Sequence, residues 1–128
     1  MSDKNKQIVE EINAAFATGD AETFLSHCSE DVSWTMVGEK ANKGKSEIRE
    51  WMASMKDTEP PKFTFDRLIA DDNAVVCSGD MLMKNKEGVA EEYAFCDIYE
   101  FSGDKIVDLQ SFVVKENPAG EKHRAATP

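Results

Sequence analysis

The sequence predicts an α+β fold in which a curved antiparallel sheet forms a cone and three helices, all in the N-terminal half, enclose a pocket. Apolar residues in the first part of the chain recur at three- and four-residue spacing, which is typical of amphipathic helices. Beyond the Pro60-Pro61 dipeptide they alternate in steps of two, and short turn sequences separate the alternating segments. Three short helices cannot fill the mouth of a strongly curved sheet, so we expect a hollow between the two layers.

The three predicted helices each have apolar side chains on one face and a recognisable start or end. Gly19 ends the first helix, and Asp20 is predicted to cap the second. Trp51 and Met55 lie on the apolar stripe of the third helix, which the two prolines end. We place the helices at residues 6–17, from Asp20 through Cys28, and from Ser46 to the Pro60-Pro61 dipeptide.

The remaining predicted elements are strands. The first begins at Val32 and ends before Gly38, after which we expect a polar loop. The later strands follow one another with tight turns rich in Asp, Asn, Ser and Gly between them, which predicts an antiparallel meander. We place the strands at residues 32–37, 63–69, 74–83, 91–101 and 105–114.

One domain is expected over residues 1–116, followed by a flexible tail over residues 117–128. A chain of 128 residues is long enough for one hydrophobic core and too short for two. The tail contains no large apolar side chain, so burial cannot offset the entropy of ordering it.

The charge balance limits the partners that we expect. The chain has 25 acidic and 15 basic residues, a formal charge of -10. This charge repels phosphate backbones and anionic lipid surfaces, so we expect neither nucleic acid nor a membrane as a partner. No targeting pattern and no apolar run long enough to cross a bilayer is present, which favours a cytoplasmic location.

The cysteines indicate neither a disulfide framework nor a metal site. Cys28, Cys77 and Cys96 are odd in number and show no CxxC or Cys/His ligand spacing. We therefore expect reduced thiols, and we expect no metal and no cofactor.

Several segments, taken in order, resemble the SnoaL-like branch of the nuclear-transport-factor-2-like superfamily. The resemblance rests on Thr18-Gly19-Asp20, Glu30-Asp31-Val32-Ser33-Trp34, Gly44-Lys45-Ser46-Glu47-Ile48, the strand from Tyr93 to Phe101, Gly103-Asp104-Lys105-Ile106-Val107 and Ser111-Phe112-Val113. It implies a cone-shaped fold with a pocket. Members of this superfamily include polyketide cyclases, ketosteroid isomerases, epoxide hydrolases, dehydratases and proteins without known chemistry, so the fold does not select an activity.

Asp97 is the first candidate catalytic residue. Alternation places Tyr93, Phe95, Asp97 and Tyr99 on one face of their strand. The resemblance to ketosteroid isomerases implies that Asp97 stays protonated in an apolar site and donates a hydrogen bond to a developing oxyanion. The positions that match the base and the tyrosine of those enzymes hold Met36 and Ile12, which disfavours proton transfer of the steroid type. The structural alternative is a carboxyl group bonded to a backbone amide or a nearby tyrosine hydroxyl.

Asp80 is the second candidate catalytic residue. Counting back from the Gly88 turn places it diagonal to Asp97 across a hairpin, where two inward carboxylates would form an acid/base pair. The epoxide hydrolases of the superfamily resemble this layout, but Ser78 and Ser111 stand where their arginine and second aspartate would be. The alternative is that Asp80 marks a bulge and is exposed.

The predicted ligand is a small, largely apolar organic molecule. Its predicted contacts, besides the two aspartates, are Trp34, Met36, Trp51, Met55, Tyr93, Phe95, Tyr99 and Ser111. The alternative for the large apolar members is that they fill the core. Two functions stay open: an enzyme of the isomerase, cyclase or hydro-lyase kind with Asp97 as acid or oxyanion donor, and a binding or dimerisation module without chemistry.

A second copy of the chain is the predicted macromolecular partner. Sheets of this kind leave apolar surface that a homodimer can cover. The residues predicted for that interface are Val76, Met81, Met83 and Val114.

Overall fold

The structure, a computed structural model, describes residues 2–54, 61–85 and 87–116. Its helices are α1 (Ser2–Ala17), α2 (Ala21–Ser26) and α3 (Lys45–Ala53). Its strands are β1 (Cys28–Met36), β2 (Lys40–Lys43), β3 (Lys62–Asp71), β4 (Ala74–Lys84), β5 (Ala90–Ser102) and β6 (Lys105–Lys115). The predicted α+β class is confirmed. Met55, Lys86 of the predicted hairpin turn and the predicted tail at 117–128 lie outside the described residues.

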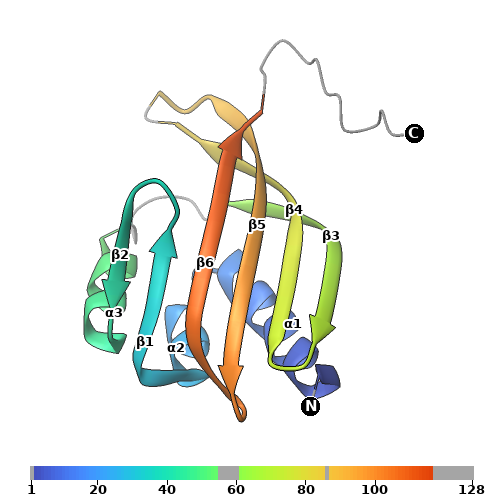
Figure 1. The fold of residues 1–128 in the computed structure, drawn as a ribbon. Helices are drawn as coiled ribbons and strands as arrows, with labels where there is room; N and C mark the ends of the chain where they lie inside the picture. Colours follow the sequence, from blue (N-terminus) through green and yellow to red (C-terminus); the bar gives the residue numbers. More distant parts are fainter. Residues whose placement is uncertain (1, 55–60, 86, 117–128) are drawn as a thin grey trace.

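The strands form one sheet in the order β2-β1-β6-β5-β4-β3 (Figure 1). Neighbouring strands are antiparallel except β1 and β6, which run parallel. The sheet is therefore mixed, and the prediction of a wholly antiparallel sheet is wrong at this one pairing. The pattern within β1 shows which side chains are buried, but it carries no information on which strand lies alongside.

Several element boundaries differ from the sequence prediction: α1 begins at Ser2, four residues earlier than predicted, and β1 begins at Cys28, also four residues earlier. Residues 40–43, predicted as a polar loop, form the short edge strand β2, whose apolar content is too low to show alternation. Helix α2 ends at Ser26, two residues earlier than predicted, and Cys28 already belongs to β1. A backbone hydrogen bond holds the start of β1 against β6: the Ile106 amide donates to the His27 carbonyl oxygen at 2.8 Å. The predicted cap is confirmed, since the Asp20 side chain accepts from the Thr23 amide.

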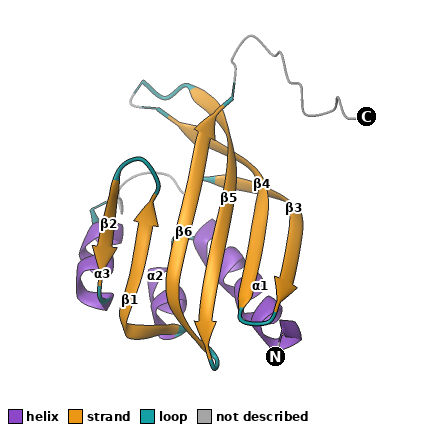
Figure 2. Cartoon of the chain, viewed as in Figure 1, coloured by secondary structure: helices purple, strands orange, loops and turns teal. Residues whose placement is uncertain are grey.

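All three helices cover the same face of the sheet, and they lie behind it in the view of Figure 2. The core lies between this helix-covered face and the helices. Large, fully buried side chains from both layers meet there: Tyr99, Phe24, Ile12, Leu25, Ile48, Ile106 and Leu109. Among the described residues, none of the helices combines the length and the apolar character that crossing a membrane requires.

The opposite face of the sheet, here called the uncovered face, carries exposed apolar side chains. Ile69, Leu82, Phe112 and Val114 are all exposed. Of the residues predicted for a dimer interface, Val114 lies on this face, and Val76 pairs with Ile69 there. Met81 and Met83 instead lie on the helix-covered face, where Met81 is buried and Met83 packs partly against the core, so their assignment to an interface is wrong.

Strand β3 carries a bulge that brings it close to β4. The register shifts between Phe65 and Arg67, directly opposite Gly79. A side-chain carbon added at Gly79 would collide with the Thr64 carbonyl oxygen. Glycine is therefore required here for space.

Candidate functional site

Asp97 lies on the helix-covered face, as the alternation predicted. In the register of the sheet it is opposite Cys77 of β4 and Ser111 of β6, and both of these neighbours are buried. The residues two positions away on the same strand, Phe95 and Tyr99, are buried as well. Asp97 is thus a partly buried carboxyl group on an otherwise largely apolar surface.

Ser111 lies between Asp97 and Trp34 of β1. The indole Nε1 of Trp34 donates to Ser111 Oγ at 3.0 Å. Ser111 lies directly opposite Asp97 in the sheet, and its side chain lowers the pKa of the Asp97 carboxyl. Trp34 is held by aromatic neighbours. Its ring centroid lies 5.0 Å from that of Trp51, 5.1 Å from that of Phe24 and 5.9 Å from that of Phe16.

This environment raises the pKa of Asp97 from an ordinary value of 3.8 to about 6. Burial is the larger cause, because it penalises the ionised form, and the hydrogen bond from Ser111 opposes it. A carboxyl group with such a pKa is populated both as acid and as carboxylate near pH 6. Asp97 can therefore donate a proton or a hydrogen bond under mildly acidic conditions.

Asp80 does not join Asp97 on this face. Residues directly opposite in a sheet share a face, and Asp80 is opposite Ala94 whereas Asp97 is opposite Cys77. Ala94 and Asp97 are three positions apart on β5, so alternation turns them to opposite sides. The predicted pairing of the two carboxylates is wrong, because the hairpin register sets the face of Asp80 and the sequence does not specify that register. The bulge considered as an alternative is present, but it lies in β3 opposite Gly79.

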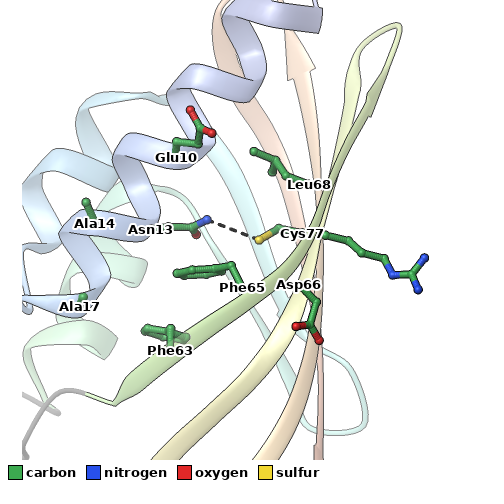
Figure 3. Close-up of a pocket in the computed structure, with 10 residues that line it drawn as sticks. Glu10, Asn13, Ala14, Ala17, Phe63, Phe65, Asp66, Leu68 and Cys77 are labelled. Carbon is green, nitrogen blue, oxygen red and sulfur yellow. Dashed lines mark hydrogen bonds between the residues drawn. The ribbon is translucent and has the colours of Figure 1, made fainter. Parts of the chain in front are cut away.

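A pocket of about 410 Å³ lies between α1 and the β3–β4 edge of the sheet (Figure 3). Asn13 and Cys77 point toward each other in it, and Asn13 Nδ2 donates to Cys77 Sγ at 3.4 Å. Cys77 is also the residue opposite Asp97, so it connects this pocket to the candidate acid. The lining residues are Glu10, Asn13, Ala14, Ala17, Phe63, Phe65, Asp66, Arg67, Leu68 and Cys77.

The residues predicted to contact a ligand are not among those that line this pocket. Trp34 is buried, and Met36 and Trp51 are partly buried against the same core. These three side chains therefore help to fill the core, which was the alternative to a ligand contact. Phe95 is the predicted contact nearest the pocket lining, with its ring centroid 5.6 Å from that of Phe63 and 5.8 Å from that of Phe65. Met55 lies outside the described residues, and the ligand-binding role of the others stays a prediction.

Two tyrosines on the face of Asp97 differ in their surroundings. Tyr93 packs partly against the core, and its hydroxyl donates to Glu91 at 3.1 Å. Tyr99 is fully buried, and its hydroxyl has no hydrogen-bond partner among the described residues. Burial raises the pKa of Tyr99 well above its ordinary value, and the charge of Asp97 adds to the shift.

Sequence reasoning missed the pocket lining, although one signal was present. Asn13 lies within the buried stripe of α1, between Ile12 and Phe16, and an amide on an apolar helix face needs a partner. Phe63 and Phe65 were recognised as strand residues only. Their place opposite α1 is a contact between distant parts of the chain, which the sequence pattern does not reveal.

The thiols fit the prediction of reduced cysteines, since Cys28, Cys77 and Cys96 are all free. Burial raises the pKa of Cys77 to about 11 and that of Cys28 to about 12, so both remain thiols at neutral pH. Within the described residues, no group of three or more His, Cys, Asp or Glu side chains is arranged to hold a metal ion.

Comparison with known proteins identifies a related family and related structures. The family of SnoaL-like domains matches residues 9–109. An NTF2-like protein from Cytophaga hutchinsonii has 24% identity and a TM-score of 0.71, over 85% of this chain and 98% of that one. An LEH-like epoxide hydrolase from M. tuberculosis has 16% identity and a TM-score of 0.77, over 88% of this chain and 84% of that one.

SalBIII is a third similar structure, an epoxide hydrolase/cyclase-like enzyme in pyran ring formation of the polyether salinomycin. It has 20% identity and a TM-score of 0.77, over 87% of this chain and 91% of that one. No curated protein sequence matches the chain. At these identities the structural similarity establishes the fold, and it is the fold that the resemblance implied.

Proposed function

The chain belongs to the family of SnoaL-like domains, and from this premise we propose that it binds a small, largely apolar organic molecule at the helix-covered face, with Asp97 as the polar contact. One observation carries the proposal: a partly buried carboxyl group whose pKa is raised to about 6 stands opposite Cys77, which lines the pocket. Burying an ionisable carboxyl group among apolar side chains lowers the free energy of unfolding. Functional sites typically contain groups that are held at such a cost and have shifted pKa values.

The pocket lining supports an apolar ligand that carries an oxygen acceptor. Five of the lining residues, Ala14, Ala17, Phe63, Phe65 and Leu68, present apolar side chains. Protonated Asp97 would donate its hydrogen bond to a carbonyl, lactone, ether or epoxide oxygen of the ligand. The cyclase-like and epoxide hydrolase-like enzymes among the similar structures support this ligand class by analogy of fold.

The chemical role that suits Asp97 is that of an acid. Its proton, or a hydrogen bond from it, stabilises negative charge that develops on a ligand oxygen during isomerisation, ring closure or loss of water. The apolar surroundings strengthen this interaction because they lower the local dielectric constant.

A binding module without chemistry is the second candidate. It is favoured by the register, which turns Asp80 to the uncovered face and leaves Asp97 without the predicted carboxylate partner. Met36 and Ile12 are apolar where the resemblance to ketosteroid isomerases requires a base and a tyrosine. The two candidates share the ligand site and differ only in turnover.

The binding proposal is tested by thermal-shift screening of apolar ketones, lactones and epoxides at pH 5 and at pH 8. These compounds do not ionise in this range, so a pH effect reports on the protein. We expect the wild type to bind its best ligand about fivefold more tightly at pH 5, because one hydrogen bond to an acid contributes roughly 1 kcal/mol. Asp97→Asn keeps a donor and should bind with no pH dependence, whereas Asp97→Leu should lose most of the affinity.

Asp80→Asn is the matched control, since it changes an aspartate of the adjacent strand on the other face of the same sheet. It should respond like the wild type. Equal ligand responses of wild type, Asp97→Leu and Asp80→Asn would overturn the site. Mass spectrometry of the bound ligands after incubation then separates the two candidate functions, because only an enzyme forms product. Product formation should be lost in the Asp97 variants and kept in Asp80→Asn.

A further inference from the structure

We propose that Trp34 and Ser111 are positioning residues for Asp97: the indole N–H of Trp34 fixes the Ser111 hydroxyl, which holds one carboxyl oxygen of Asp97 and leaves the other oxygen to present the acid proton. The inference extends the proposed function, on which the role of that proton rests. The hydrogen-bond arrangement itself can be tested without any ligand.

The direction of each hydrogen bond follows from the donors available. An indole N–H can only donate, so Ser111 Oγ must accept in the 3.0 Å contact with Trp34 Nε1. A serine hydroxyl has a single hydrogen, and the acceptor that the sheet register places directly opposite Ser111 is the carboxyl group of Asp97, whose pKa Ser111 lowers. In the proposed arrangement the hydroxyl hydrogen points to Asp97, and the chain runs in one direction from β1 through β6 to β5.

Both positioning residues are held rigidly. Ser111 is buried, which limits competition from water for its hydroxyl. The sheet register places Ser111 directly opposite Asp97 on the neighbouring strand. The Trp34 ring packs against the rings of Phe16, Phe24 and Trp51, with centroids between 5.0 and 5.9 Å away, so rotation of the indole would disrupt this cluster.

The chain determines which carboxyl oxygen is free. One oxygen of Asp97 accepts from Ser111, so the acid proton resides on the other oxygen, where it can be donated to a ligand. A donor to the carboxyl group also favours its ionised form. Removing the Ser111 hydroxyl should therefore raise the pKa of Asp97, and removing the Trp34 N–H should raise it less, because Ser111 then turns freely between donating and accepting.

Other titratable groups lie near Asp97 or line the neighbouring pocket. Three nearby groups have a pKa raised above its ordinary value, and therefore far above that of Asp97: Cys77 of β4 and Cys96 and Tyr99 of β5. Burial is the main cause in each, and the negative charge of Asp97 adds to it. Glu10 of α1 and Asp66 and Arg67 of β3 are the charged groups that line the neighbouring pocket. A titration that persists in Asp97→Asn would not belong to Asp97.

The first experiment follows the two tryptophan indole N–H resonances by NMR between pH 4 and pH 8. We expect the Trp34 signal to shift with the same midpoint as the Asp97 carboxyl carbon, and Trp51 serves as the internal reference. The Trp34 shift should vanish in Asp97→Asn and in Ser111→Ala. A Trp34 resonance that does not titrate, or whose titration survives in both variants, would overturn the proposal.

The second experiment is a double-mutant cycle on the carboxyl titration of Asp97. Ser111→Ala should raise the midpoint by about one pH unit, the equivalent of one hydrogen bond. Trp34→Phe, which keeps an aromatic ring in the cluster, should raise it by a smaller amount, and it should have no further effect in the Ser111→Ala background. Equal effects of Trp34→Phe in both backgrounds would show that Trp34 acts through packing alone and would contradict the chain.

These outcomes are independent of the ligand screen. If the NMR shifts and the cycle behave as expected but no ligand responds to Asp97, the hydrogen-bond arrangement stands and the proposed function fails. If the screen succeeds and Trp34→Phe leaves the Asp97 midpoint unchanged, the ligand site stands and the positioning role fails.

Discussion

At Asp97, burial and hydrogen bonding act on one carboxyl group in opposite directions. Burial between Cys77 and Ser111 raises its pKa, the Ser111 hydroxyl lowers it, and the balance leaves the pKa at about 6. Above that pH the ionised group is held in surroundings that penalise charge. The residue is thus suited to donate a proton, and the fold is less stable for carrying it.

Tyr99 is a second buried polar group on the same face, and its hydroxyl has no hydrogen-bond partner within the described part of the chain. Tyr99→Phe removes this hydroxyl and keeps the ring. We predict that the free energy of unfolding stays the same or rises by about 1 kcal/mol, because an unpaired buried donor is removed. Urea denaturation measures the change.

Tyr93→Phe is the control for that substitution, since the Tyr93 hydroxyl donates to Glu91. It should leave stability unchanged or lower it slightly. A loss of more than about 1 kcal/mol in Tyr99→Phe would mean that the hydroxyl is satisfied, for example by an internal water molecule.

At the scale of single residues, the sequence predicts what depends on local alternation and misses what depends on register. Asp97 was placed on the correct face because Phe95 and Tyr99 show the period of the strand. Asp80 was placed on the wrong face because its orientation relative to Asp97 depends on how β4 pairs with β5. The role of Asn13 in the pocket requires knowing what lies opposite α1.

At the scale of elements, the junction of β3 and β4 shapes the pocket. The bulge between Phe65 and Arg67 lies opposite Gly79, where the backbones approach so closely that no side chain fits. We predict that Gly79→Ala lowers the free energy of unfolding by about 1–3 kcal/mol, the usual cost of forcing an extra carbon into a packed region. Chemical denaturation measures the loss.

Ser78→Ala provides the comparison, because it changes the adjacent residue on the uncovered face and should stay within about 0.5 kcal/mol of the wild type. Equal stability of the two variants would mean that β3 moves away from β4 at no cost. A structure of Gly79→Ala would then show β3 displaced from β4 and the pocket changed.

The elements with clear periodicity were predicted well. Helix α1, the Asp20 cap and the strands of the meander follow from apolar spacing and turn residues in the sequence. Strand β2 has four residues with little apolar character, so its pairing with β1 was not predictable from its own pattern. The parallel contact of β1 with β6 joins distant parts of the chain, which local patterns do not specify.

At the scale of the molecule, the two faces of the sheet have different roles. The helix-covered face carries the core, Asp97 and part of the pocket lining, whereas the uncovered face exposes Ile69, Phe112 and Val114. A homodimer that covers this apolar surface stays a prediction. Its interface would centre on these side chains and on Val76, and it would exclude Met81 and Met83, which face the helices.

The whole account depends on Asp97 being held in apolar surroundings on the helix-covered face, and its effect on global stability tests this most directly. Between pH 3.8 and about 6 the unfolded chain has lost the Asp97 proton while the folded protein retains it. The folded state binds more protons, so its stability falls as pH rises through this window, and the loss is complete above the folded pKa.

The measurement is the free energy of unfolding of wild type and Asp97→Asn as a function of pH. The two proteins should have similar stability at pH 3.5, and by pH 7.5 the variant should be more stable by up to about 3 kcal/mol, the equivalent of the shift in pKa. Parallel curves, or a wild type that gains stability over the variant as pH rises, would contradict the account.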